Sequence, residues 1–361
     1  MGRVEAGQAS QEDWAVLRQF LPPGWEEAAR ETGALRRARG VDGAESLLRI
    51  LLIHLSCGCS LAETAVRAQS SGLGQLSAVA LFKRLQASEE WLRWLAMEER
   101  RLLAGPQPTT GRRLRAVDAT VVSEPGSTGT NWRLHYSINL TNLQCDFFEI
   151  TDVKGGETIR RVPIAHGDIV VGDRVYSNPI GVAHVVGAGG DVLFRLNLNT
   201  TPLYQEDGRV VNVVAAVAKL KVGAICDLPT WVLPKVGDAI PGRIIAMRRS
   251  AAATRHTLIK MEREARKEKK ELSAKSRRAA QFFIVWTSLT DQTPAPEVLA
   301  FYRCRWQIEL GFKRMKSILG LGHLPKKDPA SARAWLHGKL LTSLLVERVI
   351  QAANATSPWG Y

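Results

Sequence analysis

The sequence predicts a mixed α/β fold preceded by an all-α N-terminal domain, and three observations support this. Helical patterns dominate up to about residue 103. A segment rich in glycine and proline follows at 105–111, which is typical of a linker. Beyond it, short apolar runs indicate strands, of which 134–140 alternates with polar residues, and the order is three strands in succession and then helix, strand, helix, strand.

The N-terminal region, residues 1–110, predicts a helical DNA-binding domain. A strongly apolar helix is expected at 44–55. Ser60 and Glu63 form a capping box that opens a helix to about residue 69. After a glycine turn, a second helix carries Lys83 and Arg84. This order suggests a helix-turn-helix module, and a plain helical bundle explains it equally well.

The first part of the core, residues 111–196, contains the run of predicted strands. They are expected at 114–122, 134–140, 145–153, 168–171 and 192–196, with helices at 156–161 and 178–186. This is the order of the ribonuclease-H-like fold, in which the first and fourth strands lie side by side.

An insertion of looser pattern is expected at 197–281. Strands are predicted at 210–214 and 243–247, and a long basic helix at 254–278. Residues 248–278 hold twelve Lys or Arg against four Glu, which is more than half of the net charge of the chain. The helix is either a solvated surface or a surface that follows a DNA backbone.

The core resumes at 282–328 with a strand at 282–286 and a long helix from Pro296 to Gly320, and a last helical region spans 329–361. At about 100° per residue, one stripe of the long helix is apolar. It contains Phe301, Cys304, Ile308, Met315 and Leu319. A second stripe is polar and contains Tyr302, Arg305, Glu309 and Lys316, with Trp306 and Lys313 at its border.

The composition indicates a globular protein that meets a polyanion. The chain of 361 residues carries a net charge of +14, which favours nucleic acid as a partner, although some basic enzymes share this property. Its five widely spread cysteines predict reduced, buried thiols. Neither a signal peptide nor a membrane span is predicted, so we expect a cytoplasmic protein.

Three acidic residues occupy positions that suit metal-dependent chemistry. Asp118 lies within an apolar strand, where a carboxylate must be paired or metal-bound. Asp173 follows the end of a strand, where ligands gather in α/β sheets. Glu309 lies on the polar stripe of the long helix. Two-metal phosphoryl transfer requires such a set of oxygen ligands.

The motifs around these acids resemble a known family. The pattern Tyr302-x2-Arg305-x3-Glu309-x6-Lys316 is similar to the signature of DDE transposases of insertion-sequence family four. Residues 117–120, Val-Asp-Ala-Thr, resemble its first acidic motif, and residues 172–176, Gly-Asp-Arg-Val-Tyr, resemble its second. The resemblance extends from about residue 112 to 327.

The resemblance implies a transposase with a ribonuclease-H-like core. Asp118, Asp173 and Glu309 would bind two Mg²⁺ ions, with Mn²⁺ as a substitute, to cut DNA at element ends and join it to target DNA. Its other implied DNA contacts are Tyr302, Arg305, Trp306, Lys313 and Lys316, and the candidates for base stacking are Phe283 and Trp286. A homodimer around two DNA ends, acting at the bacterial nucleoid, is also implied.

Two other functions fit the same residues. A ribonuclease-H-like nuclease or resolvase would cut without strand transfer, but it requires no long basic insertion. A DNA-binding repressor derived from a transposase would need no acids, yet all three are present. Cleavage with joining, cleavage alone and binding alone distinguish the three functions.

Overall fold

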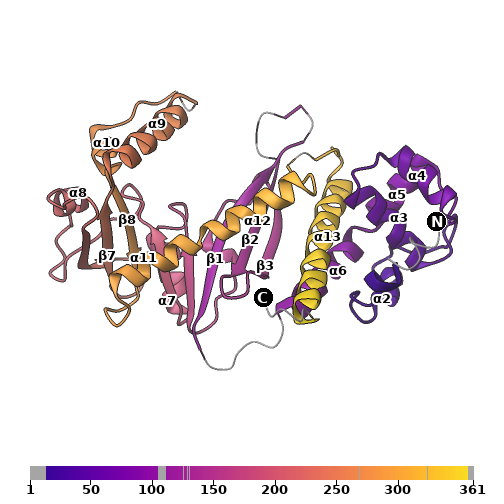
Figure 1. Cartoon of the computed structure of the whole chain (residues 1–361), viewed down its shortest axis with the longest axis horizontal. Coiled ribbons are helices and arrows are strands. Elements are labelled where there is room, and N and C mark those ends of the chain that lie inside the picture. The colour runs from indigo at the N-terminus through magenta and orange to yellow at the C-terminus, as the bar shows by residue number, and fades with distance from the viewer. Residues whose placement is uncertain are drawn as a thin grey trace, which may run out of the picture.

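The computed structural model describes residues 14–104, 111–124, 126–127, 129, 131–267, 269–322 and 324–356. Most of the linker predicted at 105–111 lies outside these residues. In Figure 1, the N-terminal helices occupy one end of the molecule, the sheet lies in the middle, and α9 and α10 project at the other end. The central sheet therefore lies between the N-terminal helices and the α9–α10 hairpin.

The central sheet has eight strands in the order β3-β2-β1-β4-β5-β8-β7-β6. β1 and β4 are parallel neighbours, as expected for the first and fourth strands, while β2 and β3 pair antiparallel beside β1. The strands span Arg113–Val122 (β1), Trp132–Asn139 (β2), Cys145–Asp152 (β3), Asp168–Gly172 (β4), Asp191–Arg195 (β5), Ile225–Val232 (β6), Ile240–Arg248 (β7) and Phe282–Thr287 (β8).

The insertion is partly built into this sheet. β7 pairs with β8 and β6 with β7, so both inserted strands extend the core sheet. The strand predicted at 210–214 is wrong, because α8 (Val213–Val217) begins there, capped by the Asn212 side chain. The basic helix predicted at 254–278 is two helices, α9 (Ala251–Lys267) and α10 (Ala274–Ala279), the second capped by Ser273.

Apolar residues cover both faces of the sheet. On β4, Val170 faces one core, while Ile169 and Val171 face another. This alternation follows from the period of two in a strand. The short helix η1 (Ile159–Arg161), where a helix at 156–161 was expected, and α7 (Pro179–Gly187) cover the first face. α11 (Ala295–Cys304) covers the second.

The long helix predicted from Pro296 to Gly320 is α11 followed by α12 (Trp306–Ser317). Arg305 separates them but keeps helical φ and ψ angles of −53° and −30°, so the two helices run on diagonally across the sheet in Figure 1. The predicted apolar stripe is partly wrong. Ile308 and Met315 are buried, but Cys304 is exposed, and Tyr302 from the polar stripe is buried.

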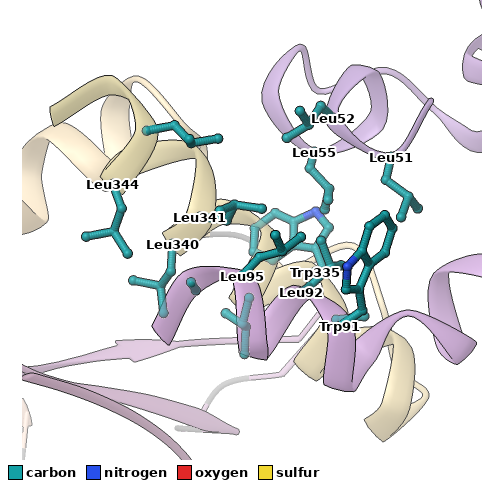
Figure 2. Close-up of a cluster of buried hydrophobic side chains, with 14 of the residues drawn as sticks. Leu51, Leu52, Leu55, Trp91, Leu92, Leu95, Trp335, Leu340, Leu341 and Leu344 are labelled. Atoms are coloured by element: carbon teal, nitrogen blue, oxygen red, sulfur yellow. The ribbon is translucent and has the colours of Figure 1, made fainter. Parts of the chain in front are cut away.

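The N-terminal helices share a core with the C-terminal helix α13 (Pro329–Thr356), β1, β2, β3 and α12. Figure 2 shows leucines and tryptophans of α3, α6 and α13 meeting at its centre. The domain division at residues 110 and 329 therefore crosses one continuous core. The N-terminal helices are α2 (Trp25–Glu31), α3 (Ala44–Ser56), α4 (Leu61–Ser70), α5 (Ala78–Ala87) and α6 (Glu89–Ala104).

Two other expectations can be compared with the structure. All five cysteines are free, as predicted, but Cys57 and Cys304 are exposed rather than buried. Among the described residues, every helix is too short or too polar to cross a membrane.

Candidate active site

The strand register brings Asp118 and Asp173 to neighbouring positions. The last pair between the parallel strands β1 and β4 joins Val117 to Gly172. Asp118 and Asp173 are the next residue on each chain, just beyond this pair. Both follow the carboxyl ends of the paired segments, which is where ligands bind in sheets of this kind. Two predicted catalytic acids are thus fixed side by side by backbone pairing alone.

Asp118 is a carboxylate with little to neutralise it. Its side chain is only 20% exposed, and burial raises its pKa to about 6. One oxygen, Oδ1, accepts a hydrogen bond from the backbone N–H of Ala119 at 2.8 Å. The other, Oδ2, lies 3.4 Å from a guanidinium nitrogen of Arg305. These contacts and the negative charge of Asp173 nearby leave the carboxylate in need of further positive charge.

Arg305 contacts two of the three predicted acids. Besides Asp118, its guanidinium donates to Glu309, one helical turn further along. Burial disfavours its charge, but the neighbouring Tyr302, the hydrogen bond to Glu309 and the charges of Glu309 and Asp173 raise its pKa overall. Its Nε atom is buried and has no hydrogen-bond partner among the described residues. One cation therefore lies between Asp118 and Glu309.

Glu309 is an exposed carboxylate next to Arg305. Its side chain is 52% exposed, although Ile308 beside it is fully buried. Lys313 and Lys316 line the same open pocket as Glu309, further along α12. Trp306 is 55% exposed at the beginning of this helix. The arrangement places one exposed carboxylate beside two cations on an open surface.

The donor set suits a hard divalent cation, although the residues are not gathered around one point. Among the described residues, no group of three or more His, Cys, Asp or Glu side chains lies close enough to hold a metal ion. Asp118, Asp173 and Glu309 offer only carboxylate oxygens, which Mg²⁺ and Ca²⁺ prefer. The raised pKa of Asp118 also indicates a carboxylate that a cation would stabilise.

A second group of side chains lies beside the acids. Tyr302 is buried, which raises its pKa to about 12, and its ring packs edge-on against Phe283 with centroids 5.2 Å apart. The guanidinium carbon of Arg195 lies 4.1 Å from the centre of the Phe283 ring, and that of Arg249 lies 5.7 Å from it. Burial, Arg174 and Arg249 lower the pKa of Arg195 to about 9.

Sequence reasoning missed this arginine group. Arg195 is 9% exposed and its Nε has no partner among the described residues. It ends the apolar strand β5, just as Asp118 lies in the apolar strand β1. A charged residue within an apolar run was the signal that identified Asp118, and the same signal identifies Arg195.

Comparison with known proteins assigns the family. Residues 109–345 match the family described as a transposase DDE domain. The chain is 31% identical over 352 residues to the transposase of insertion sequence element IS421 of Escherichia coli, covering 95% of each chain. It is equally similar to InsL of insertion sequence element IS186A from Escherichia coli strain K12, again over 95% of each chain. The chain belongs to the DDE transposase family.

A more distant relative matches only part of the chain. The transposase of insertion sequence element IS231F from Bacillus thuringiensis subsp. israelensis is 24% identical over 197 residues, which is 50% of this chain and 41% of that protein. All three acids lie within the matched transposase domain, residues 109–345. The family assignment also supports an enzyme that uses divalent metal ions.

Other acids of the transposase domain have structural partners. Arg115 is 2% exposed and bonds both oxygens of Asp146 at 2.7 and 2.8 Å. It also donates to Asp168 at 2.9 Å. Glu157 lies near Asp173. Burial and the charge of Asp173 raise the pKa of Glu157, and Arg133, which pairs with it at 3.3 Å, opposes this. These ion pairs give a structural role to the acids that lie outside the catalytic motifs.

The remaining predicted residues lie away from the acids or serve the core. Trp286 is 1% exposed and donates from its indole nitrogen to Thr230 at 3.1 Å, so it offers no face to a base. Arg84, which precedes the matched transposase domain, donates to the backbone carbonyls of Ala34, Arg37 and Arg39. Lys83 is exposed on α5.

Proposed function

We propose that this chain is the transposase of a bacterial insertion sequence, which cuts DNA strands at the ends of its element and joins them to target DNA. The observation that carries the proposal is that Arg305 contacts both Asp118 and Glu309, while the pairing of β1 with β4 puts Asp173 next to Asp118. The family assignment supports the same reaction class. The sheet order supports a ribonuclease-H-like core.

In the proposed reaction, the two steps are phosphoryl transfers of the same kind. In the first, a water oxygen attacks phosphorus, and the bond to the 3′-oxygen breaks, which leaves a 3′-hydroxyl and a 5′-phosphate. In the second, this 3′-hydroxyl loses its proton and attacks a target phosphorus, displacing the target 3′-oxygen. Mg²⁺, with Mn²⁺ as a substitute, would supply the charge that activates the attacking oxygen and stabilises the leaving one.

The residues of the chain have distinct roles in this scheme. Asp118, Asp173 and Glu309 bind the divalent ions through their carboxylate oxygens. Arg305 releases Glu309 and holds a phosphate through its planar fork, whereas Lys316 acts as a point charge. Tyr302, whose raised pKa keeps its hydroxyl protonated, donates to a phosphate oxygen.

Other residues extend the DNA contact beyond the cut strand. Lys313 and the exposed Trp306 continue the DNA surface along α12. Phe283 stacks a displaced base only if Arg195 moves off its ring, since the guanidinium now covers it. Lys83 contacts DNA from the N-terminal helices. We further propose a homodimer that brings two element ends together at the nucleoid.

The direct test is an assay with Mg²⁺ and a DNA fragment that carries the element ends. The wild-type protein is expected to give cleaved and joined products, and Glu309→Gln neither, while Glu309→Gln still binds the DNA. The surface variant Glu98→Gln, whose carboxylate pairs with Arg101 on α6, serves as the matched control and keeps activity. Cleavage without joining would overturn strand transfer, and activity of Glu309→Gln would overturn the site.

A further inference from the structure

Helix α9 separates its residues into two faces. An inner face contains half-buried residues, among them Leu258, Met261 and Ala265. At 100° per residue, these lie within about 60° of one another. The outer face is fully exposed and spans about 140° of the helix. It contains five cations, Arg255, Lys260, Arg263, Arg266 and Lys267, and the exposed Glu264 lies at its border.

Among the described residues, the acids of the hairpin form no ion pair with this outer face. Glu262 turns towards the inner face and pairs with Arg277 of α10 at 2.7 Å. Within the described part of the chain, none of the five outer cations forms an ion pair or a side-chain hydrogen bond. Exposed helices usually alternate charges of both signs, which gives modest stabilisation to the helix itself. The outer face of α9 has no such arrangement.

Core packing does not account for the outer face either. α9 is 17 residues long and contains no buried residue. In Figure 1 the hairpin of α9 and α10 projects from the end of the sheet opposite the N-terminal helices. The hairpin therefore holds a row of unpaired positive charge away from the body of the protein, at a cost in self-repulsion.

A pocket connects the hairpin to the active site. Arg174, which follows Asp173 directly, and the buried Arg195 line one side of it. Met261 of α9 and Lys275 of α10 line the other. Arg174, Arg195 and Lys275 therefore put three cations between Asp173 and the hairpin, which favours a nucleic-acid chain in this direction.

We propose that the outer face of α9 clamps the phosphate backbone of duplex DNA next to the strand being cut. From Arg255 to Lys267 the helix rises about 18 Å, along which a duplex presents about ten phosphate charges. About half of these charges belong to each strand, so five cations on one face match the phosphates of one strand without reading any base. The inference takes DNA as the partner from the proposed function and adds where the duplex outside the active site is held.

The test replaces all five outer cations with glutamine and measures binding to a short duplex that lacks element ends, with a chelator and no metal. The matched control removes the same charge from five exposed arginines that already have acidic partners, namely Arg18, Arg67, Arg93, Arg101 and Arg209. Affinity is measured at salt concentrations from about 50 to 200 mM, where phosphate binding gives a steep log–log slope.

The slope of the outer-face variant is expected to fall by about 0.9 for each phosphate that is no longer neutralised, to a maximum of about 4.5, and that of the control by less than about 1. Equal slopes for wild type and outer-face variant, or an equal fall in the control, would overturn the clamp. The milder variant Arg263→Gln with Arg266→Gln should reduce the slope by up to about 1.8. Thermal unfolding of both outer-face variants should match wild type, since none of these side chains has a partner among the described residues.

The same measurement separates this inference from the proposed reaction. Glu309→Gln lacks the catalytic carboxylate but retains α9, so it should bind the plain duplex with the slope of wild type. If the slope falls in the outer-face variant while the wild-type protein shows no cleavage of element ends, the clamp stands and the reaction fails. If cleavage occurs and the slope is unchanged, the reaction stands and the clamp fails.

Discussion

Replacing Asp118 with asparagine is expected to stabilise the metal-free protein while removing its activity. The carboxylate of Asp118 is 20% exposed, and the cation that pairs with it, Arg305, lies 3.4 Å away. Asparagine has the same shape and carries no charge. Its carbonyl oxygen can still accept the hydrogen bond from the N–H of Ala119. The variant therefore removes a desolvated charge and leaves the local structure in place.

The size of the effect follows from the pKa of Asp118, which rises from 3.8 to about 6 on folding. The raised value means that the folded state holds the proton more tightly than the unfolded state does. The carboxyl group of Asp118 therefore does not lower the free energy of unfolding below about pH 3.8. Above that pH the loss of free energy grows until the pH reaches about 6. At 1.36 kcal/mol for each unit, the full cost above pH 6 is about 3 kcal/mol.

The assay is chemical or thermal unfolding with a chelator, at pH values from about 4 to 8. Asp118→Asn should match wild type at the acidic end and exceed its free energy of unfolding by about 3 kcal/mol at the other. The control Asp238→Asn changes an exposed carboxylate in the loop between β6 and β7 and should alter stability by less than about 0.5 kcal/mol. A gain that does not vary with pH, or no gain at pH 8, would refute the reasoning.

Two further predictions concern the framework of the site. Arg115→Gln should lower the free energy of unfolding by about 3–5 kcal/mol in urea, because the buried carboxylate of Asp146 loses both hydrogen bonds from Arg115, whereas Asp168 keeps its pair with Arg113; full stability in this variant would contradict the prediction. Gly338→Ala should lower it by about 1–3 kcal/mol in a thermal melt, because the new Cβ would lie 2.3 Å from Cδ1 of Leu55; an unchanged melt would show that α3 shifts without cost.

The sequence predicts the central strands and their order because each depends on a local pattern. β2 alternates apolar and polar residues, and β4, β5 and β8 are short continuous apolar runs, each bounded by glycine or polar residues. The pairing of β1 with β4 follows from the order of the elements. Three successive strands, a helical connection and a fourth strand are the order of a fold in which the first and fourth strands are neighbours. The neighbouring positions of Asp118 and Asp173 then follow from strand register.

The missed features depend on tertiary contacts. The strand β6 has exposed residues on alternate positions and contains Pro229, so its pattern is weak, and pairing with β7 decides it. The predicted apolar stripe of the long helix fails at Tyr302, whose ring is buried against Phe283 although its position lies on the polar stripe. The arginine group around Phe283 becomes visible only when β5, β7 and β8 lie together.

The arrangement of α11 and α12 explains why the three acids need not be gathered in the metal-free protein. Asp118 and Asp173 are fixed by strand pairing, but Glu309 is held by Arg305 on a side chain that is 52% exposed. α11 and α12 pack into different cores, so Arg305 lies at the junction of both. In the metal-free protein Arg305 therefore supplies the positive charge next to Asp118 and Glu309, a role that divalent ions would take over when they bind.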